Sequence, residues 1–354
     1  MIKKILFVDL FSPRGHYNFN SIYLRAINNI PGVSVDVLFV EGFLEGMGLD
    51  KTMYVNSFVF NKYESRKTDL IHKLFWRWHQ MARLRYCKKL VRKNKYDFVF
   101  FSTFDELTFS LFGILKKNVM AVYHQDSNHL LGSSLVLKSM RSIAKKVKII
   151  SLNKAYSELM ETEGIRNTFV PHGFIPAKPE ENNGNRSIFV PINDAIDFDL
   201  VHKLVSASFS DLLVRLNVTM TIKNIPGLPL NLPNIRVTER YIPAEEYKRL
   251  FATSELILLP YDRNEYRYRT SAMLFEAIAN QKYVAIPTAE AFMSLKNSED
   301  TGMFMYDSVE DIYQYVHNLF GGKKITSPQY EGIMSENGIS VITNTIMMLM
   351  DEKQ

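Results

Sequence analysis

The chain has 354 residues, of which 46% are hydrophobic and 23% charged, and its formal net charge is +6. This length predicts two domains of similar size, each with its own core. A single cysteine, Cys87, excludes a disulfide framework and a cysteine-based zinc site, and it favours a reducing compartment. No apolar run approaches the roughly 20 residues that span a bilayer, and Asp9 interrupts the first run, which argues against a signal peptide. We therefore expect a cytoplasmic protein.

Short β-rich runs alternate with helical stretches in the first half of the chain. A polar loop over residues 12–16 follows the first run and precedes a helix that ends before Pro31 and Gly32. The sequence predicts strands at 5–8, 35–40, 56–60, 98–101, 119–123, 148–151 and 168–170, and further helices near 105–115, 133–146 and 154–162. Apolar strands separated by helices indicate a parallel sheet buried on both faces. Residues 1–174 are therefore expected to form a Rossmann-like domain.

The same alternation resumes after a polar, turn-rich segment at 175–186, which predicts a linker. Strands are expected at 187–190, 218–222, 235–237, 256–260 and 283–286, with helices at 200–213, 244–252, 271–279, 309–319 and 338–350. These elements predict a second Rossmann-like α/β domain over 187–335, and a final helix within 336–354 that could cross back to the first domain. Two such domains predict a ligand cleft between the carboxyl ends of their strands.

The positive charge is concentrated in residues 66–95. This stretch has eleven basic side chains, one acid (Asp69) and both tryptophans. Its apolar residues recur at helical spacing, namely Ile71, Leu74, Phe75, Trp78, Met81 and Ala82. One interpretation is a basic amphipathic helix on an anionic membrane surface, and another is a scaffold helix whose apolar face packs on the sheet. A nucleic-acid groove is a third, but no RNP, KH or helix-turn-helix signature accompanies the charge, so we expect no nucleic-acid partner.

Several common catalytic motifs are missing. After the first strand only Gly15 appears where a dinucleotide-binding site would carry Gly-x-Gly-x-x-Gly, and there is no Walker A, His-Glu-x-x-His or Gly-x-Ser-x-Gly sequence. The segment Asp197-Phe198-Asp199 looks like the Asp-x-Asp that holds a metal in single-domain glycosyltransferases. It falls at a predicted helix start, where acids are favoured by the helix dipole. We expect no metal site.

The stretch 241–288 carries the clearest chemistry. The segment 261–270 is polar, bears Arg263, Arg267 and Arg269, and opens the helix at 271–279. A helix that begins at the carboxyl end of a parallel strand can hold an anion, because its free N–H groups and its dipole point at the ligand. Glu276 lies one and a half turns into this helix, where its carboxylate could accept hydrogen bonds from two adjacent sugar hydroxyls. The pattern indicates a nucleoside diphosphate site, whereas the alternative is an ordinary helix with a surface glutamate.

Together with Val170-Pro171-His172-Gly173, this stretch resembles the retaining GT-B glycosyltransferases of family 4. The resemblance covers nearly the whole chain in architecture and is specific in sequence over residues 235–290 and 168–174. The family carries a Glu-x7-Glu motif at this helix; Glu276 matches its second, ribose-binding glutamate, and Tyr268 stands at the first. The segment Arg269-Thr270-Ser271 is similar to the Arg-x-Ser pattern of polysaccharide-type relatives.

The resemblance also implies which groups meet the diphosphate. Family members carry Arg and Lys after the first strand of the second domain, where this chain has Ile192-Asn193-Asp194-Ala195. Lys223, together with Arg267 or Arg269, is therefore expected to replace them. The donor would further contact Gly15 in the first domain and Thr270, Ser271, Ala272 and Glu276 in the second.

In the first domain the resemblance points to loops at strand ends. His16, beside Gly15, is expected at the acceptor, and His124 is similar to the family's histidine near the reacting carbon, although a structural role for it stays open. His172 is expected to pack at the hinge and Gly173 to allow a backbone turn. Three acids at the predicted cleft edge could orient acceptor hydroxyls, Asp105, Glu106 and Asp126. Asp105 could equally cap a helix.

The sequence thus predicts a GT-B protein that moves a sugar from a nucleoside diphosphate sugar to a glycan or lipid-linked glycan in cell-surface polysaccharide synthesis. The resemblance implies a retaining, metal-independent enzyme with no cofactor besides its nucleotide-sugar substrate, in which His124, Lys223 and Arg269 are catalytic. The helix within 66–95 would hold it at the inner face of the membrane. One alternative is a non-catalytic GT-B subunit that binds a partner or glycan, and another is a sugar-nucleotide epimerase.

Overall fold

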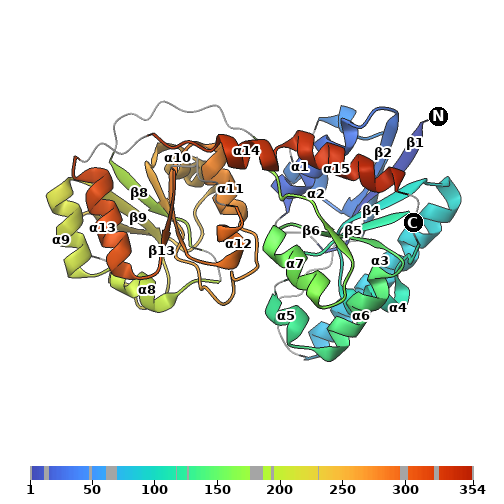
Figure 1. Cartoon of the computed structure of the whole chain (residues 1–354), viewed down its shortest axis with the longest axis horizontal. Helices are drawn as coiled ribbons and strands as arrows, with labels where there is room; N and C mark the ends of the chain where they lie inside the picture. Colours follow the sequence, from blue (N-terminus) through green and yellow to red (C-terminus); the bar gives the residue numbers. More distant parts are fainter. Residues whose placement is uncertain are drawn as a thin grey trace. The chain divides into compact units, whose positions relative to one another are not determined.

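The computed structural model describes residues 2–11, 16–47, 50–60, 70–116, 118–125, 127–175, 186–192, 195–229, 231–295, 302–322 and 327–352. The chain forms two compact units (Figure 1). Unit 1 comprises Met1–Phe174 and Asn337–Gln354, and unit 2 comprises Ile175–Glu336. Most of the linker that the sequence predicts, residues 176–185, lies outside the described residues.

The sheet of unit 1 has seven parallel strands in the order β3-β2-β1-β4-β5-β6-β7. These are β1 (Lys3–Asp9), β2 (Val33–Val40), β3 (Ser57–Phe60), β4 (Phe98–Thr103), β5 (Val119–Val122), β6 (Lys148–Ser151) and β7 (Asn167–Phe169). All seven fall where the sequence predicts strands. The chain moves outward from β1 to one edge and then returns to β4, so the switch point of the topology lies between β1 and β4.

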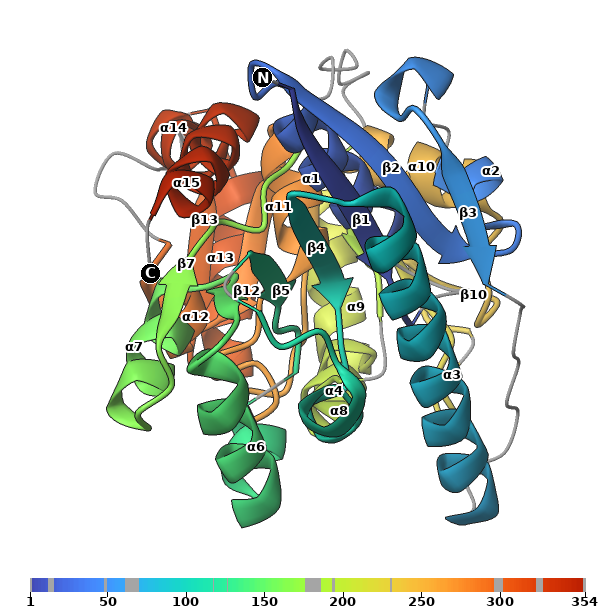
Figure 2. The same ribbon diagram turned by 90° about the vertical axis from the view of Figure 1, so that its right-hand side faces the viewer.

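Helices cover both faces of this sheet. They are α1 (Tyr17–Asn28), α2 (Phe43–Met47), α3 (Leu70–Asn94), α4 (Glu106–Phe112), α5 (Ser127–Leu131), α6 (Ser134–Ala144), α7 (Lys154–Thr162) and α15 (Ile339–Asp351), with a 3₁₀ turn at Lys51–Met53. Helices α1 and α15 pack together on Ile5 and Phe7 of β1. Figure 2 shows α3, α4 and α6 on the opposite side of the strands from α1.

The C-terminal helix α15 belongs to the core of unit 1. Thr343 Oγ1 donates a hydrogen bond to the carbonyl of Ala26 in α1 (2.9 Å), and Lys3 Nζ pairs with Asp351 Oδ1 (2.7 Å). Ile342 and Ile346 of α15 are completely buried in the same cluster as β1. The last residues of the chain therefore complete the fold of the first half.

Unit 2 has six parallel strands in the order β10-β9-β8-β11-β12-β13. They are β8 (Ser187–Val190), β9 (Thr219–Lys223), β10 (Ile235–Thr238), β11 (Leu256–Leu258), β12 (Tyr283–Pro287) and β13 (Met303–Tyr306). The helices are α8 (Phe198–Leu204), α9 (Ala207–Leu216), α10 (Ala244–Thr253), α11 (Ala272–Ala279), α12 (Glu290–Met293), α13 (Val309–Phe320) and α14 (Glu331–Asn337). In Figure 1, α8, α9 and α13 lie on one side of the strands and α10, α11 and α12 on the other. The switch point lies between β8 and β11.

The expectation of a single helix at 200–213 is wrong, because the structure has two helices there. Helix α8 ends at Leu204, and Ser206 begins α9, where its side chain accepts a hydrogen bond from the backbone N–H of Phe209 (3.4 Å). Serine is a strong helix N-cap, but apolar residues continue at helical spacing on both sides of Ser206, so the sequence pattern shows no helix end there.

No helix in the described part of the chain is long and apolar enough to cross a membrane.

Candidate functional site

The loop from Tyr261 to Thr270, between β11 and α11, is built on stacked aromatic rings. The rings of Tyr261 and Tyr266 are nearly parallel, with centroids 3.7 Å apart, and both stack against Phe292. Ser271 is the N-cap of α11: its Oγ accepts from the N–H of Leu274 (3.1 Å) and lies 2.6 Å from the hydroxyl of Tyr261. The side chain of Ser271 thus caps the helix and bonds to Tyr261, and its predicted role at the donor stays a prediction.

The three arginines of this loop have different neighbours. Arg263 donates to the carbonyl of Tyr306 (2.8 Å) and pairs with Asp307 (3.0 Å), while Arg267 Nε pairs with Glu290 Oε1 (2.7 Å). Arg269 lies over the ring of Tyr266 at 5.3 Å, and no carboxylate among the described residues forms an ion pair with it. Arg267 and Arg269 are both predicted at the diphosphate. Because the charge of Arg267 is already balanced by Glu290, Arg269 is the better candidate to bind a phosphate.

Glu276, the predicted ribose ligand, is held by α10. The hydroxyl of Tyr247 donates to Glu276 Oε2 at 3.4 Å, and the ring of Tyr247 packs against Phe189 and Phe251 with centroids 5.7 Å away in both cases. Burial raises the pKa of the Glu276 carboxyl above its usual range, and the bond from Tyr247 acts in the opposite direction. The packed aromatic ring fixes one carboxylate oxygen, so the side chain is positioned before a ligand arrives.

A cavity of about 650 Å³ opens at the carboxyl ends of β8, β9 and β10. Its cations are Lys223, which ends β9, and Arg240, which follows β10; Tyr241, 80% exposed, and Tyr247 supply aromatic walls. The remaining lining residues are Pro191, Ile192, Ile196, Phe198, Asn224, Ile225, Pro226 and Met273. Its volume is within the range of ligand pockets, about 300–1,000 Å³.

The sequence analysis missed Arg240, Tyr241 and Tyr247. The first two directly follow a strand of a parallel sheet, which is the signal that could have identified them.

Thr270 and Ala272 flank the N-cap of α11. Their role at the donor stays a prediction, as do the roles of Lys223, Arg267 and Arg269.

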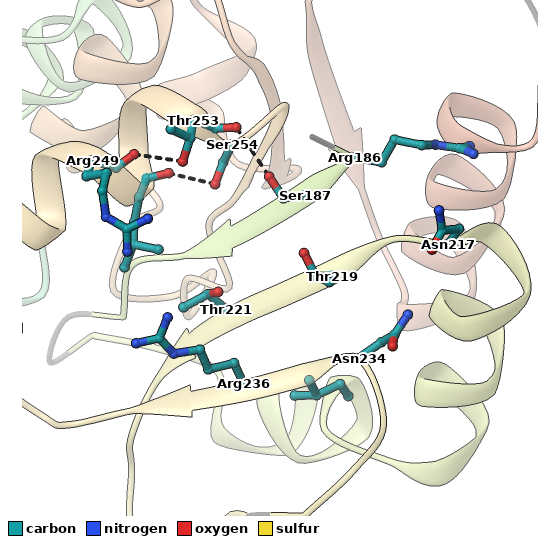
Figure 3. Close-up of a pocket in the computed structure, with 12 residues that line it drawn as sticks. Arg186, Ser187, Asn217, Thr219, Thr221, Asn234, Arg236, Arg249, Thr253 and Ser254 are labelled. Atoms are coloured by element: carbon teal, nitrogen blue, oxygen red, sulfur yellow. Dashed lines mark hydrogen bonds between the residues drawn. The ribbon is translucent and has the colours of Figure 1, made fainter. Parts of the chain in front are cut away.

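A second cavity, of about 620 Å³, lies at the other end of the same strands (Figure 3). Three of its five hydroxyl side chains bond to the backbone: Ser187 Oγ donates to Thr253 O (3.3 Å), Ser254 Oγ to Leu250 O (2.6 Å) and Thr253 Oγ1 to Arg249 O (2.8 Å). It contains none of the residues that the sequence predicts at the donor, so the cavity beside Lys223 is the better candidate.

In unit 1 the structure brings three histidines together around Phe19. The rings of His16 and His124 stack with centroids 4.6 Å apart, Phe19 packs edge-on to His124 at 4.6 Å, and His172 lies 5.3 Å from Phe19. Burial lowers the pKa of His16, and it lowers the pKa of His172 to about 4. Both imidazoles are therefore neutral at physiological pH and can contact a sugar without adding positive charge.

The backbone is unusual at His16 and at Gly173, which follows His172. His16 has φ 62°, a left-handed conformation that non-glycine residues seldom adopt and that often marks functional sites. Gly173 has φ 79°, and a Cβ there would lie 2.5 Å from Ile342 and 2.7 Å from Ile22. The turn after β7 therefore requires glycine, as the sequence predicts for a backbone turn. Gly15 lies outside the described residues.

The residues predicted to bind the acceptor differ in where the structure places them. The side chain of Asp105 caps α4 by accepting from the N–H of Thr108 (2.8 Å), which is the structural alternative named for it, and Asp126 lies outside the described residues. Glu106 is buried, and its Oε1 lies 2.7 Å from Nε2 of His129, a partner that the sequence analysis did not identify. The acceptor roles of His16 and Asp105 stay predictions.

Helix α3 does not pack through the apolar stripe that its periodicity suggests. Leu74, Phe75 and Trp78 are 60%, 56% and 63% exposed, whereas Gln80 and Arg83 are buried and donate to the carbonyl of Leu10. Figure 2 shows the first half of α3 extending past the arrowhead of β4. The expectation that this stripe packs on the sheet is therefore wrong for the first half of the helix.

No group of three or more His, Cys, Asp or Glu side chains in the described ranges could hold a metal ion. Asp197, in the Asp-x-Asp segment, caps α8 by accepting from the N–H of Leu200 (2.9 Å).

Comparison with known proteins defines the fold. No protein-family model matches the chain, and no curated protein sequence matches it. Among solved structures, HepE of Anabaena bound to UDP-glucose is similar at 13% identity, with a TM-score of 0.65 over 98% of each chain. A glycosyltransferase of Rickettsia africae is similar at 14% identity and TM-score 0.67, covering 99% of this chain and 98% of that one. UDP-GlcNAc 2-epimerase of Neisseria meningitidis, bound to UDP-GlcNAc, is similar at 12% identity and TM-score 0.61, covering 98% and 99%. The chain has the GT-B fold, built from two Rossmann-like units with parallel sheets.

Proposed function

We propose that this protein is a glycosyltransferase that transfers a sugar from a nucleoside diphosphate sugar to a glycan or lipid-linked glycan. The observation that supports the proposal is the cavity of unit 2, whose lining includes Lys223, Arg240 and Tyr247, and the hydroxyl of Tyr247 donates a hydrogen bond to Glu276. The structures of similar fold support it, since HepE binds UDP and UDP-glucose and the Rickettsia protein is a glycosyltransferase.

Each lining group has a role toward such a donor. Lys223 and Arg240 neutralise the diphosphate, Glu276 accepts hydrogen bonds from the ribose hydroxyls, and the exposed ring of Tyr241 stacks on the base. The N–H groups of α11, with Thr270 and Ala272, and the guanidinium of Arg269 face the charge that develops on the leaving phosphate. The cations stabilise that charge, so the proposed enzyme uses no metal ion and no cofactor.

The proposed mechanism is retaining, as the resemblance to family 4 implies. The acceptor oxygen bonds to the anomeric carbon while the bond from that carbon to the diphosphate breaks, and its electron pair goes to the diphosphate. The acceptor proton passes to the departing phosphate oxygen on the same face. The protein then supplies positioning and charge stabilisation, with His16 and His124 lining the path of the sugar and acceptor.

We also propose that the protein works at the inner face of the membrane in cell-surface polysaccharide synthesis. The support comes from α3, which presents Leu74, Phe75 and Trp78 to solvent within a strongly basic stretch. Exposed apolar and tryptophan side chains among Lys and Arg are the features that bind anionic lipid surfaces. A lipid-linked acceptor would reach unit 1 from such a surface.

The donor site is tested by thermal shift with UDP, GDP, ADP and CMP at millimolar concentration. A nucleotide that binds only the folded state raises the melting temperature with its concentration. We expect one diphosphate to stabilise the wild type and to have little effect on Glu276→Ala. If none of the four stabilises the wild type, the transferase proposal is wrong.

A non-catalytic role is the second candidate, because Tyr268 occupies the place of the first family glutamate. It predicts no nucleotide-induced shift, so the same experiment separates the two. An epimerase, the function of the Neisseria protein, would bind nucleotide but would convert UDP-GlcNAc to its 2-epimer without any acceptor. Proton NMR of UDP-GlcNAc incubated with the protein detects that product.

A further inference from the structure

The second cavity of unit 2 lies on an open face of its sheet (Figure 3). Met220 and Ile222 of β9 are completely buried in the core of unit 2. Thr219 and Thr221 alternate with them, so they point to the opposite face, where they line the cavity. The described residues of 224–234, which connect β9 to β10, contain no helix that could cover this face. Inner strands of parallel sheets are normally buried on both faces, so an open polar face on β9 is an exception.

Two hydroxyl groups of the cavity are left for a ligand. Neither the hydroxyl of Thr219 nor that of Thr221 has a hydrogen-bond partner among the described residues. The other three hydroxyl residues of the cavity, Ser187, Thr253 and Ser254, bond to backbone carbonyls. A threonine hydroxyl can both donate and accept, so the floor of the cavity offers two polar contacts to a bound molecule.

The cavity has an excess of positive charge. Of the twelve described residues that line it, three are arginines and none is acidic. Arg236 of β10 pairs with Glu246 of α10 at 3.1 Å, but the guanidinium of Arg249, one turn further along α10, forms no ion pair and no hydrogen bond within the described ranges. In Figure 3, Arg236 and Arg249 extend toward the same end of the cavity, near Thr221, whereas Arg186 extends toward the other end. Two guanidinium groups therefore share one carboxylate at this end.

We propose that this cavity binds a phosphorylated small molecule, whose phosphate contacts Arg236 and Arg249 and whose remaining polar groups lie over Thr219 and Thr221. Guanidinium groups match phosphate oxygens in a bidentate geometry, and these charge-assisted hydrogen bonds are stronger than neutral ones. A volume of about 620 Å³ is within the range of small-molecule pockets. The site lies at the opposite end of the strands from the cavity beside Lys223, so it is separate from the donor site and does not rest on the proposed function.

The test is isothermal titration calorimetry of the full-length protein with inorganic phosphate, glycerol 3-phosphate and glucose 6-phosphate, with glucose and sodium chloride of matched ionic strength as controls. We expect saturable binding of at least one phosphate-bearing probe and no binding of glucose. Arg249→Ala and Arg236→Ala should bind that probe at least about tenfold more weakly. Both variants should keep the wild-type melting temperature without ligand, because both side chains are exposed.

Two control variants separate this site from other cationic surfaces. Arg215→Ala removes an arginine of α9 that lies outside the cavity, and it should bind the probe as tightly as wild type. Arg240→Ala removes a cation of the cavity beside Lys223, and it should also leave the affinity unchanged.

Each outcome decides the proposal. It is overturned if no phosphate-bearing probe binds wild type beyond the effect of sodium chloride, or if Arg249→Ala binds as tightly as wild type. Loss of binding in Arg240→Ala with binding retained in Arg249→Ala would place the anion in the other cavity and would also overturn it. If UDP does not stabilise the protein but phosphate binding is lost in Arg249→Ala and Arg236→Ala, the transferase proposal fails and this inference stands.

Discussion

The ribose contact of Glu276 can be tested by a thermodynamic cycle that changes the protein and the ligand. The protein change is Glu276→Ala, and the ligand change replaces UDP with 2′-deoxy-UDP, which lacks one ribose hydroxyl. A hydrogen bond to a charged group contributes about 1.5–3 kcal/mol, so wild type should bind UDP about tenfold to a hundredfold more tightly than the deoxy ligand. In Glu276→Ala the two ligands should bind within about twofold of each other.

Isothermal titration calorimetry measures the four dissociation constants. The cycle cancels any loss that Glu276→Ala causes equally for both ligands, including the effect of leaving the Tyr247 hydroxyl without its carboxylate. A suitable control is Glu246→Ala, because Glu246 is on the same helix as Tyr247 but pairs with Arg236 at 3.1 Å. Additive losses in the Glu276 cycle, meaning the same ratio of affinities in wild type and variant, would refute the assignment of Glu276 to the ribose.

Four further predictions follow from the structure. Burial raises the pKa of the Glu276 carboxyl in the folded chain, so the unfolded chain loses this proton at a lower pH than the folded chain does, and rising pH destabilises the folded state. Glu276→Gln should therefore raise the melting temperature near neutral pH but not near about pH 4. Arg240→Ala should weaken UDP binding at least about tenfold and reduce its salt dependence, whereas equal affinity would exclude Arg240 from the diphosphate. Replacing both Phe75 and Trp78 by serine should abolish flotation with anionic vesicles while leaving the melting temperature unchanged, since both side chains are exposed; a large drop in melting temperature would show that they pack. Gly173→Ala should destabilise unit 1 by about 1–3 kcal/mol in chemical denaturation, because alanine meets a positive φ and close contacts there, and an unchanged midpoint would contradict this geometry of the turn.

Apart from β13 (Met303–Tyr306), for which the sequence analysis gave no strand, the strands of the described residues could be predicted because buried parallel strands have a strong local signal. β1 and β5, for example, are short apolar runs bounded by polar or turn-forming segments, and every residue of β5 is buried. The division into α8 and α9 was missed because the end of α8 depends on the cap at Ser206, which the apolar periodicity does not show. Element type was thus encoded locally, while this boundary was set by one hydrogen bond.

The orientation of α3 shows why periodicity cannot identify the packed face of a helix. Its apolar stripe includes Trp78, which is exposed, whereas Arg83 is buried. Arg83 is drawn inward because its guanidinium satisfies the carbonyl of Leu10 just after β1, and its charge lies over the ring of Phe60 at 5.6 Å. That partner is more than 70 positions away in the chain, so no local pattern could reveal it.

The same limit explains which parts of the candidate site were found. Glu276 was predicted because it belongs to a motif at a helix, but Arg240 and Tyr247 become neighbours of that helix only when β10 and α10 are placed beside it. The chain lacks the cation pair that the resemblance to family 4 implies after the first strand, and Lys223 and Arg240, which we propose at the diphosphate, follow the next two strands of the same sheet. The attraction between a cation and a phosphate depends on their distance and surroundings, not on the strand from which the cation comes. A motif search would therefore interpret the missing pair as a lost donor site, whereas the geometry of the sheet offers two cations at the same edge.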